Sequence, residues 1–438
     1  MTSAEEHPPT APTAPAGTDH RLWPVATVMA TGIFATTFVQ TQSLGYLPFN
    51  ALLTKMGLNS DTSATFFSLA MLPWTFKIIA GLLVDSVPLF GSRRRSYLVL
   101  SALAATIMWL LIGAAPVHYR LLLILAFGMN AAIVFGSTAS GGLLVEAGQR
   151  FGMSGRLSSL RVCAQYIAAG VVGPLSGWIA DHAMAGKYPL AVTSAAAILP
   201  LLCMFLSAWL LLKEPPLAVK PAHGRSFVQQ MFYVIESIWA QIRNVLRLQM
   251  LLPACLMFFI QAVPTFRSTC LYQYQTVTLE FTNAQLGWLT LAGYAPTILS
   301  AGLYAWWCRK ASLRSSLYGA VILTSLSALP YLFYTSSMPR ALAIESGGTF
   351  LQILAYLPLF DLAVRCTPKG SEALGYSLLI GVWNIGLMIG IKAGPSLYEH
   401  VFNRNLNQLI WLNAGVTLAG IFLVFFLPRK LVEQREGG

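Results

Sequence analysis

Twelve apolar stretches, separated by short polar segments, run through this chain and constrain its fold more than any other feature. A helix needs about 20 apolar residues to cross the hydrocarbon core of a bilayer, which matches the length of these stretches. We therefore predict an all-α, polytopic membrane protein with 12 transmembrane helices. The expected helices cover 23–48, 61–84, 96–117, 119–147, 157–181, 189–213, 248–275, 283–305, 313–335, 341–364, 371–396 and 406–428.

The composition excludes a large soluble domain. Hydrophobic residues make up 56% of the 438 residues and charged residues only 10%, whereas soluble proteins carry about 25% charged residues. The net charge of +12 does not indicate a nucleic-acid partner, because the basic residues lie in short loops without an aromatic binding platform. The six cysteines lie in or beside apolar stretches without metal-ligand spacing, which predicts free thiols, no metal site and no cofactor.

The longest polar connection divides the apolar stretches into six and six. We expect residues 23–213 to form one six-helix bundle and residues 248–428 to form a second. The linker 214–247 includes a polar–apolar segment, 227–247, with the pattern of an amphipathic helix at the membrane interface. Residues 1–22 have no apolar core, so they are expected to be a disordered cytoplasmic tail and not a cleavable signal. Residues 429–438 form a second cytoplasmic tail.

The distribution of basic residues predicts the orientation. If the N-terminus is cytoplasmic, 20 of the 28 Lys and Arg residues lie on the inner side, five on the outer side and three inside the helices. Cytoplasmic loops of membrane proteins carry an excess of Lys and Arg. The bias predicts that both termini are cytoplasmic, in a plasma membrane (the inner membrane of a bacterium), and it supports the alternation of 12 crossings.

One charged loop joins the second and third apolar stretches. Asp85 ends the second stretch, where a carboxylate can pair with an arginine, and Gly91 permits a tight turn. Topology anchoring by the arginines at the membrane surface is the alternative role. The Gly81-x-x-x-Asp85 spacing before a Gly-Arg cluster resembles the loop signature of the major facilitator superfamily, which implies a latch between two bundles. Gly302 to Lys310 in the second half keeps the glycine and the basic residues but lacks the acid.

Three segments resemble the folate–biopterin transporter family more narrowly. They are Pro73 to Leu98, with Lys77, Asp85-Ser86 and the arginine run; Leu157 to Arg161; and Arg365 to Glu372 followed by Asn384-Ile-Gly386. The resemblance covers both halves and implies a major facilitator fold and a symporter for folates or pterins that works by alternating access. The chain departs from the family where paired acids are expected: the fourth stretch offers Glu146 alone and the tenth Glu345 alone.

Three cations lie inside the predicted helices. A charge at the bilayer centre costs at least about 2.5–3.5 kcal/mol, so such residues face a cavity, a partner or the interface. Basic residues suit the glutamate tail of a folate, and amide and aromatic side chains suit a pterin ring. Snorkelling to the interface and polar helix packing are the alternatives. The predicted substrate-binding residues are Lys77, Arg267, Lys392, Gln165, Gln261, Tyr294 and Asn384.

A second group of charged residues lies at the cytoplasmic helix ends. Glu146 with Arg150, and Asp361 with Arg365, have the i,i+4 spacing of ion pairs on one helix face. We expect such pairs to lock and release the two bundles. A coupling proton on Glu146 or Asp85 is the alternative, because a desolvated acid can hold a proton. The predicted gating and coupling residues are Asp85, Arg93, Arg94, Arg95, Glu146, Arg161, Asp361 and Arg365.

These features favour a monomeric secondary active transporter for a small organic anion, with the lipid bilayer as its other partner. The alternative substrate is another organic anion, such as a siderophore or a cell-wall fragment, taken up by a major facilitator importer. A membrane-embedded enzyme or receptor is disfavoured, because the chain has no nucleophile–base set, no paired metal ligands and no phosphate-binding loop.

Overall fold

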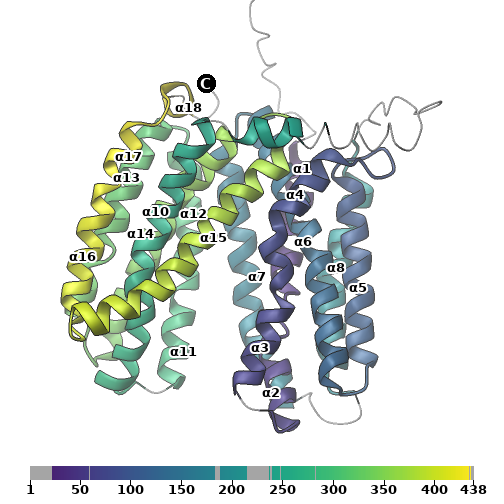
Figure 1. Cartoon of the computed structure of the whole chain (residues 1–438), viewed down its shortest axis with the longest axis horizontal. Coiled ribbons are helices and arrows are strands. Elements are labelled where there is room, and N and C mark those ends of the chain that lie inside the picture. The colour runs from purple at the N-terminus through teal and green to yellow at the C-terminus, as the bar shows by residue number, and fades with distance from the viewer. Residues whose placement is uncertain are drawn as a thin grey trace, which may run out of the picture.

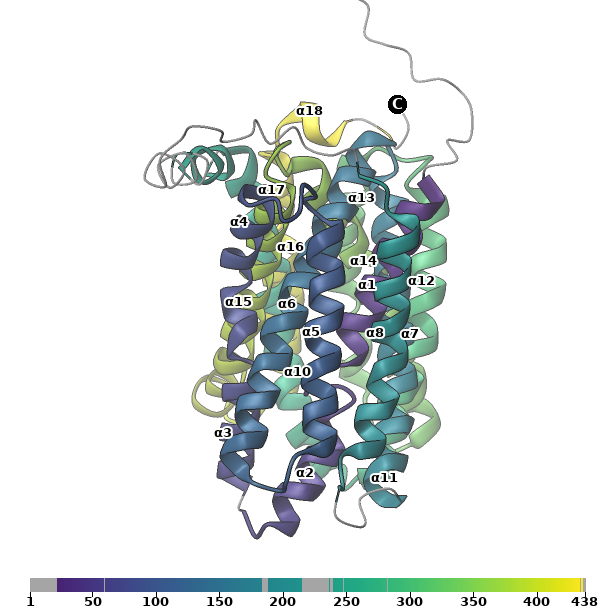
Figure 2. The same cartoon turned by 90° about the vertical axis from the view of Figure 1, so that its right-hand side faces the viewer.

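A computed structural model describes residues 22–58, 60–182, 188–214, 236, 239–246, 248–281, 283–433 and 435, and these residues form helices without a named strand. In hydrocarbon a backbone can satisfy its polar groups inside a helix, which explains why the apolar stretches adopt this form. Ten helical segments are long and apolar enough to cross a membrane by length and composition. The helices lie in two groups side by side (Figure 1), and in both views most of them run along the same direction (Figures 1 and 2).

The first group follows the first half of the chain. Its elements are α1 (Leu22–Phe38), α2 (Tyr46–Lys55), α3 (Ser60–Ala70), η1 (Leu72–Phe76), α4 (Lys77–Ser86), α5 (Arg95–Ala114), α6 (Tyr119–Arg150), α7 (Ser154–His182) and α8 (Ala191–Leu211).

The second group contains α10 (Leu248–Gln273), the π-helical η2 (Tyr274–Thr278), α11 (Asn283–Ala292), α12 (Tyr294–Trp307), α13 (Leu313–Leu326), η3 (Leu329–Phe333), α14 (Met338–Cys366), α15 (Glu372–Ser396), the π-helical η4 (Leu397–Val401), α16 (Leu406–Ala419), α17 (Ile421–Phe425) and α18 (Arg429–Val432).

The predicted 12-crossing, all-α architecture agrees with these elements, although several crossings are interrupted. The first predicted crossing consists of α1, which has 17 residues, and the turn that leads into α2. The second crossing consists of α3, η1 and α4, and the eighth is broken at Gly293 between α11 and α12. The fourth is longer than predicted, because α6 extends to Arg150.

The linker prediction is only partly within the described residues. Residues 239–245 are helical, with Trp239 exposed and Val245 buried, as an amphipathic helix requires. The remainder of the predicted 227–247 helix, apart from Glu236 and Leu246, lies outside the described residues. So do residues 1–21 of the predicted tail 1–22, whose last residue, Leu22, begins α1.

Glycines let helices of the second group approach closely. A Cβ atom at Gly386 of α15 would lie 2.8 Å from the Phe258 carbonyl oxygen of α10, and one at Gly390 would lie 2.5 Å from the Ala262 carbonyl oxygen. Small residues at this spacing are the usual means by which membrane helices pack backbone to backbone. They allow α15 to pack closely against α10.

The two groups meet at one end. We call the end that carries the α4–α5 and α14–α15 connections the Arg94 end, and the opposite end, with α2 and α11, the far end (Figure 1). Helix α15 contacts α4 and α6, while α7 contacts α12 and α14. Toward the far end α15 tilts away from α4 (Figure 1), and α3 and α11 each pack on helices of their own bundle. The contacts that join the bundles therefore concentrate near the Arg94 end.

Candidate functional site

The charged loop between α4 and α5 folds as a tight turn. Phe90 and Gly91 have positive φ angles of 51° and 74°, and the backbones of Leu89 and Ser92 exchange two hydrogen bonds of 3.1 and 3.0 Å. Positive φ at both central residues is the geometry of a two-residue turn that favours glycine. The predicted turn at Gly91 is thus confirmed, and it brings Arg94 back beside Asp85.

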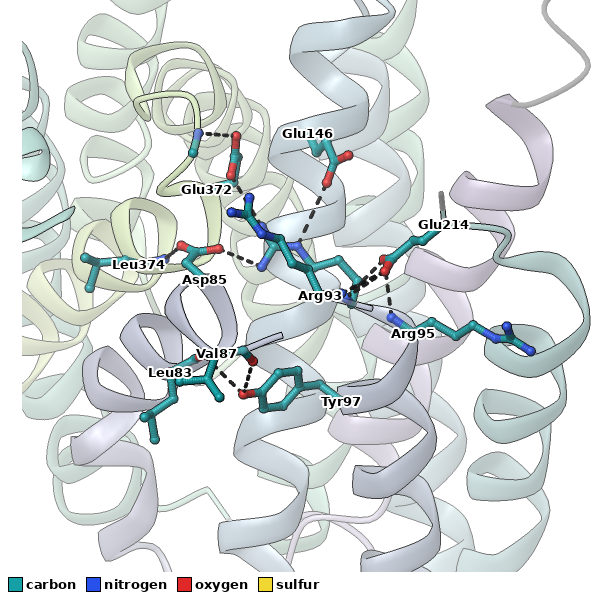
Figure 3. A network of polar contacts seen from close by, with 12 residues as sticks. Leu83, Asp85, Val87, Arg93, Arg95, Tyr97, Glu146, Glu214, Glu372 and Leu374 are labelled. Atoms are coloured by element: carbon teal, nitrogen blue, oxygen red, sulfur yellow. Dashed lines mark hydrogen bonds and ion pairs between the residues drawn. The ribbon is translucent and has the colours of Figure 1, made fainter. Parts of the chain in front are cut away.

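Arg94 is the centre of a buried ionic network that crosses from one bundle to the other. Figure 3 shows Asp85 of the first bundle and Glu372 of the second, which both pair with it. Arg94 and Asp85 are each 1% exposed, and Arg94 Nη1 lies 2.7 Å from Asp85 Oδ1. Arg94 Nη2 lies 3.4 Å from Glu372 Oε2 of α15. Removing one partner of such a buried pair costs about 3–5 kcal/mol, because the other charge stays buried. The network therefore favours the arrangement in which the Arg94 end is joined.

Two glycines make room for this network. A Cβ atom at Gly142 of α6 would lie 2.6 Å from Arg94 Cζ, so only a residue without a side chain fits beside the guanidinium. A Cβ atom at Gly81 of α4 would lie 2.9 Å from the Ala373 carbonyl oxygen of α15. Gly81 and Asp85 are four residues apart on one helix face, and Asp85 Oδ2 accepts a hydrogen bond of 2.7 Å from the backbone N–H of Leu374. The Gly-x-x-x-Asp spacing therefore serves a close contact between bundles.

Glu214 is a functional candidate that the sequence reasoning missed. It follows α8, and its carboxylate accepts hydrogen bonds from the backbone N–H groups of Arg93 (2.9 Å) and Arg94 (3.0 Å) and from Ser92 Oγ (2.6 Å), as Figure 3 shows in part. A carboxylate at a helix N-terminus satisfies free N–H groups and interacts favourably with the helix dipole. Glu214 thereby holds the start of α5 and the position of Arg94. The only signal for Glu214 in the sequence is that this acid directly follows the predicted helix 189–213.

The other two arginines of the loop have different contacts. Arg95 stacks on Trp209 of α8, with its Cζ 4.7 Å from the ring centroid, and donates a hydrogen bond of 3.0 Å to the Trp209 carbonyl oxygen. Arg93 contributes its backbone N–H to Glu214. Their contacts lie within the first bundle, so Arg94 is the member of the run that joins the two bundles.

A second network joins α14 to α6 and α7. Asp361 Oδ1 pairs with Arg365 Nε at 2.8 Å, which confirms the predicted i,i+4 pair, and Arg365 Nε also donates a hydrogen bond of 3.0 Å to Ser154 Oγ of α7. Gln149 Nε2, which the sequence reasoning missed, donates to the carbonyl oxygens of Val364 (2.8 Å) and Thr367 (2.6 Å). These bonds satisfy free carbonyl groups near the end of α14 and tie it to the first bundle.

The predicted Glu146–Arg150 pair is wrong. The Arg150 guanidinium lies over the Phe151 ring, with its Cζ 5.2 Å from the ring centroid. The Glu146 side chain is 56% exposed, and its carboxylate approaches Arg94 Nε at 3.9 Å. The i,i+4 spacing did not predict the Glu146–Arg94 contact, because Arg94 comes from a neighbouring part of the fold and not from the same helix.

No carboxylate partner is found among the described residues for the predicted site cations Lys77, Arg161 and Arg267. Lys77 Nζ donates to Ser137 Oγ at 2.8 Å, and Arg161 lies over the Phe360 ring of the other bundle, with its Cζ 4.5 Å from the ring centroid. Arg267, which is 6% exposed, stacks at 3.9 Å on the Tyr331 ring and reaches the Ser327 carbonyl oxygen at 3.4 Å. Buried cations without a counter-ion are expensive unless a ligand neutralises them.

Arg161 lies where the bundles meet, over the Phe360 ring of α14 and 6.0 Å from the Tyr376 ring centroid of α15. Trp383 of α15 packs on Phe360, with ring centroids 5.4 Å apart. Tyr356 also packs edge-on against Trp383, with ring centroids 4.6 Å apart, and accepts a hydrogen bond from Gln352 Nε2 at 2.6 Å. The structure thus places Arg161, predicted as a gating residue, against aromatic rings of the second bundle.

The remaining predicted substrate-binding residues are dispersed. The Tyr294 ring centroid lies 6.3 Å from that of Tyr166 in the other bundle, and Gln165 is half-buried beside Tyr166. Gln261 is buried and its Oε1 atom has no hydrogen-bond partner. Asn384 and Lys392 are exposed on α15, beyond the point where Gly381 approaches Ile78 of α4. The structure does not bring Asn384 or Lys392 into contact with the three unpaired cations.

Comparison with known proteins identifies the family. The model of the BT1 family matches residues 41–437. "Folate-biopterin transporter" of Synechocystis sp. is 29% identical over 386 residues, which cover 85% of this chain and 75% of that protein. "Folate transporter 1" of Plasmodium falciparum is 23% identical over 374 residues, covering 81% of this chain and 70% of that protein.

Solved structures show the same fold at low sequence identity. The proton:xylose symporter XylE, of the major facilitator superfamily, superposes with a TM-score of 0.67 at 13% identity, covering 93% of this chain and 96% of that chain. The human organic anion transporter MFSD10 superposes with a TM-score of 0.65 at 12% identity, covering 92% and 98%. The chain therefore belongs to the BT1 family, has the fold of major facilitator superfamily transporters, and is an integral membrane transporter and not an enzyme.

Proposed function

We propose that this protein is a secondary active transporter for folate- or pterin-type organic anions. The observation that carries the proposal is the presence of three intrahelical cations without a carboxylate partner among the described residues: Lys77 and Arg161 from the first bundle and Arg267 from the second. Each cation would gain a charge-assisted hydrogen bond from a bound carboxylate, worth about 1.5–3 kcal/mol. The names of the relatives, folate and folate–biopterin transporters, support the same substrate class.

Aromatic and amide groups beside the cations suit a flat heteroaromatic ring. Trp383 and Phe360 have ring centroids 5.4 Å apart, and Trp383 packs on Tyr356. Planar rings bind to such faces by offset or edge-on stacking. Gln261 and Gln352 add amide groups that can donate to and accept from a pterin. The second bundle would then hold the ring, while the cations hold the acidic tail.

The proposed mechanism is alternating access. In this structure the Arg94 end is joined by two networks, one around Arg94 and one around Arg365. The excess of Lys and Arg at that end favours a cytoplasmic location, with both termini cytoplasmic in a plasma or bacterial inner membrane. The structure then corresponds to an outward-facing state. Release to the cytoplasm requires both networks to open while the far ends of the bundles approach each other.

Purified protein in ATP-free liposomes tests this function. We expect accumulation of labelled folate when a proton gradient or internal counter-substrate is supplied, and competition by excess pterin. A siderophore and a cell-wall peptide serve as competing anions. Competition by one of these but not by folate would move the assignment to another organic anion, and a strict ATP requirement would exclude secondary transport.

A further inference from the structure

A carboxylate in the second bundle is held entirely by neutral donors. Glu345 of α14 accepts hydrogen bonds from Tyr331 Oη at 2.8 Å, from Tyr334 Oη at 3.1 Å and from Gln275 Nε2 at 3.1 Å. Gln275 Nε2 also donates to Tyr334 Oη at 2.7 Å. Glu345 lies seven residues after Met338, at which α14 begins, about 10 Å along the helix axis from the far end. It is half-buried, so the far end gives it limited access to solvent.

The local fold is arranged around this carboxylate. Helix α10 ends at Gln273 and continues as the π-helical turn Tyr274–Thr278, from which the Gln275 side chain reaches Glu345. Single π-helical turns often occur at functional sites. The Tyr331 and Tyr334 rings come from the segment between α13 and α14, where they stack in parallel with centroids 5.6 Å apart. Two segments of the chain, the π-helical turn and the segment between α13 and α14, therefore converge on one acid of α14.

Glu345 differs from the acids at the Arg94 end. Asp85 and Asp361 each pair with an arginine at 2.7 or 2.8 Å. Glu345 has no cation within ion-pair distance among the described residues. An arginine has no acceptor atom and cannot adjust to a protonated partner, whereas a phenol or an amide can donate or accept. The Glu345 network can therefore accommodate an added proton by reorienting hydroxyl groups.

The nearest cation lies on the other side of a tyrosine ring. Arg267 stacks on Tyr331, and the Tyr331 hydroxyl donates to Glu345, so one ring separates the guanidinium from the carboxylate. Arg267 Nε has no hydrogen-bond partner. The titratable or charged groups that face Glu345 are thus Tyr331, Tyr334 and, through Tyr331, Arg267. Glu345's own helix carries no charged residue within one turn of it.

We propose that Glu345 carries the proton that is coupled to substrate binding. The Glu345 carboxylate takes up one H⁺ from the solution at the far end and becomes a neutral acid. This step removes a negative charge beside Arg267, which then binds the carboxylate of the substrate more tightly. When the Arg94 end opens, the acid releases the same H⁺ to the other side. This proposal rests on the proposed function, because the substrate coupled to the proton is the transported anion. The first test below does not use that substrate.

The first test needs no substrate. Infrared difference spectra of the purified protein, recorded as the pH is lowered, report the C=O band of a protonated carboxyl group. We expect a band that is present in the wild type and in Glu399→Gln, an exposed acid near the far end, and absent in Glu345→Gln. Persistence of the full band in Glu345→Gln would overturn the assignment.

The second test uses transport. Glutamine imitates the protonated acid, so Glu345→Gln should bind folate and exchange it for internal folate at a rate near that of the wild type. It should lose all accumulation driven by a proton gradient, whereas Glu399→Gln should keep it. Proton-driven accumulation by Glu345→Gln, or loss of binding and exchange together, would contradict the proposal. If the wild-type protein shows the infrared band but transports no folate, folate is not its substrate. The protonation of Glu345 would remain supported in that case.

Discussion

Asp85 of α4 accepts a hydrogen bond of 2.7 Å from the backbone N–H of Leu374 in α15, although 289 residues separate them in the sequence. The other oxygen of the same carboxylate pairs with Arg94. Leu374 lies in the first turn of α15, where backbone N–H groups have no partner within the helix. One carboxylate therefore joins two helix ends from different bundles, and its charge serves both contacts.

Asp85→Asn should shift the protein away from the state that is joined at the Arg94 end. Asparagine can still accept from Leu374, but Arg94 loses the charge that compensates it, at a cost of about 3–5 kcal/mol. Distances between spin labels at Phe90 and Lys369, both exposed, should lengthen in a background without the native cysteines. Glu433→Gln, in the exposed pair with Arg429, is the control and should change nothing. An unchanged distance distribution and normal transport in Asp85→Asn would disprove the latch.

Gly81→Ala should weaken the same contact by steric means. The added Cβ would lie 2.9 Å from the Ala373 carbonyl oxygen and 2.9 Å from Leu374 Cα, and backbone atoms cannot move aside cheaply. Gly302→Ala is the matched control, because Gly302 occupies the corresponding position in the second half and a Cβ there would meet nothing within 4 Å. We expect slower folate transport and longer label distances for Gly81→Ala alone. Equal effects of both substitutions would point to general helix damage.

Glu214→Ala should lower thermal stability and loosen the α4–α5 loop. The loss of a capping acceptor at a helix N-terminus typically costs about 0.5–2 kcal/mol. Glu214→Gln keeps one acceptor oxygen, so its melting temperature in detergent should lie between those of the wild type and Glu214→Ala. Glu433→Ala, which removes an acid from an exposed ion pair, is the control. Equal melting temperatures for Glu214→Ala and Glu433→Ala would show that the Glu214 cap contributes nothing to thermal stability.

Lys77→Ala and Arg267→Ala should each weaken folate binding about tenfold to over a hundredfold, the equivalent of one charge-assisted hydrogen bond. A neutral pterin without the glutamate tail should lose much less affinity. Lys392→Ala, at an exposed position on α15, should bind both ligands like the wild type. Binding measured by calorimetry in detergent separates these cases. Equal losses for the charged and the neutral ligand would argue against an anion site.

The sequence alone determined those features that depend on neighbouring residues. The length of the apolar stretches predicted the helices, since each crossing is a local property of about 20 residues. Positive φ at Gly91 and the Asp361–Arg365 pair were also predictable, because a turn and an i,i+4 contact lie within a few residues. The family resemblance also depends on short motifs, whose residues are neighbours in the sequence.

Only the tertiary structure decided which charges meet. Glu214 is 120 residues from Arg94, Gln149 is 215 from Val364, and Gln275 is 70 from Glu345. Such contacts depend on the rotation and tilt of each helix against its neighbours, which the apolar pattern of a membrane helix leaves nearly undetermined because lipid and protein are both apolar. For this reason the partner predicted for Glu146 is wrong and the sequence offered little sign of Glu214. The proposal for Glu345 likewise depends on Gln275, a distant residue that only the fold brings to its carboxylate.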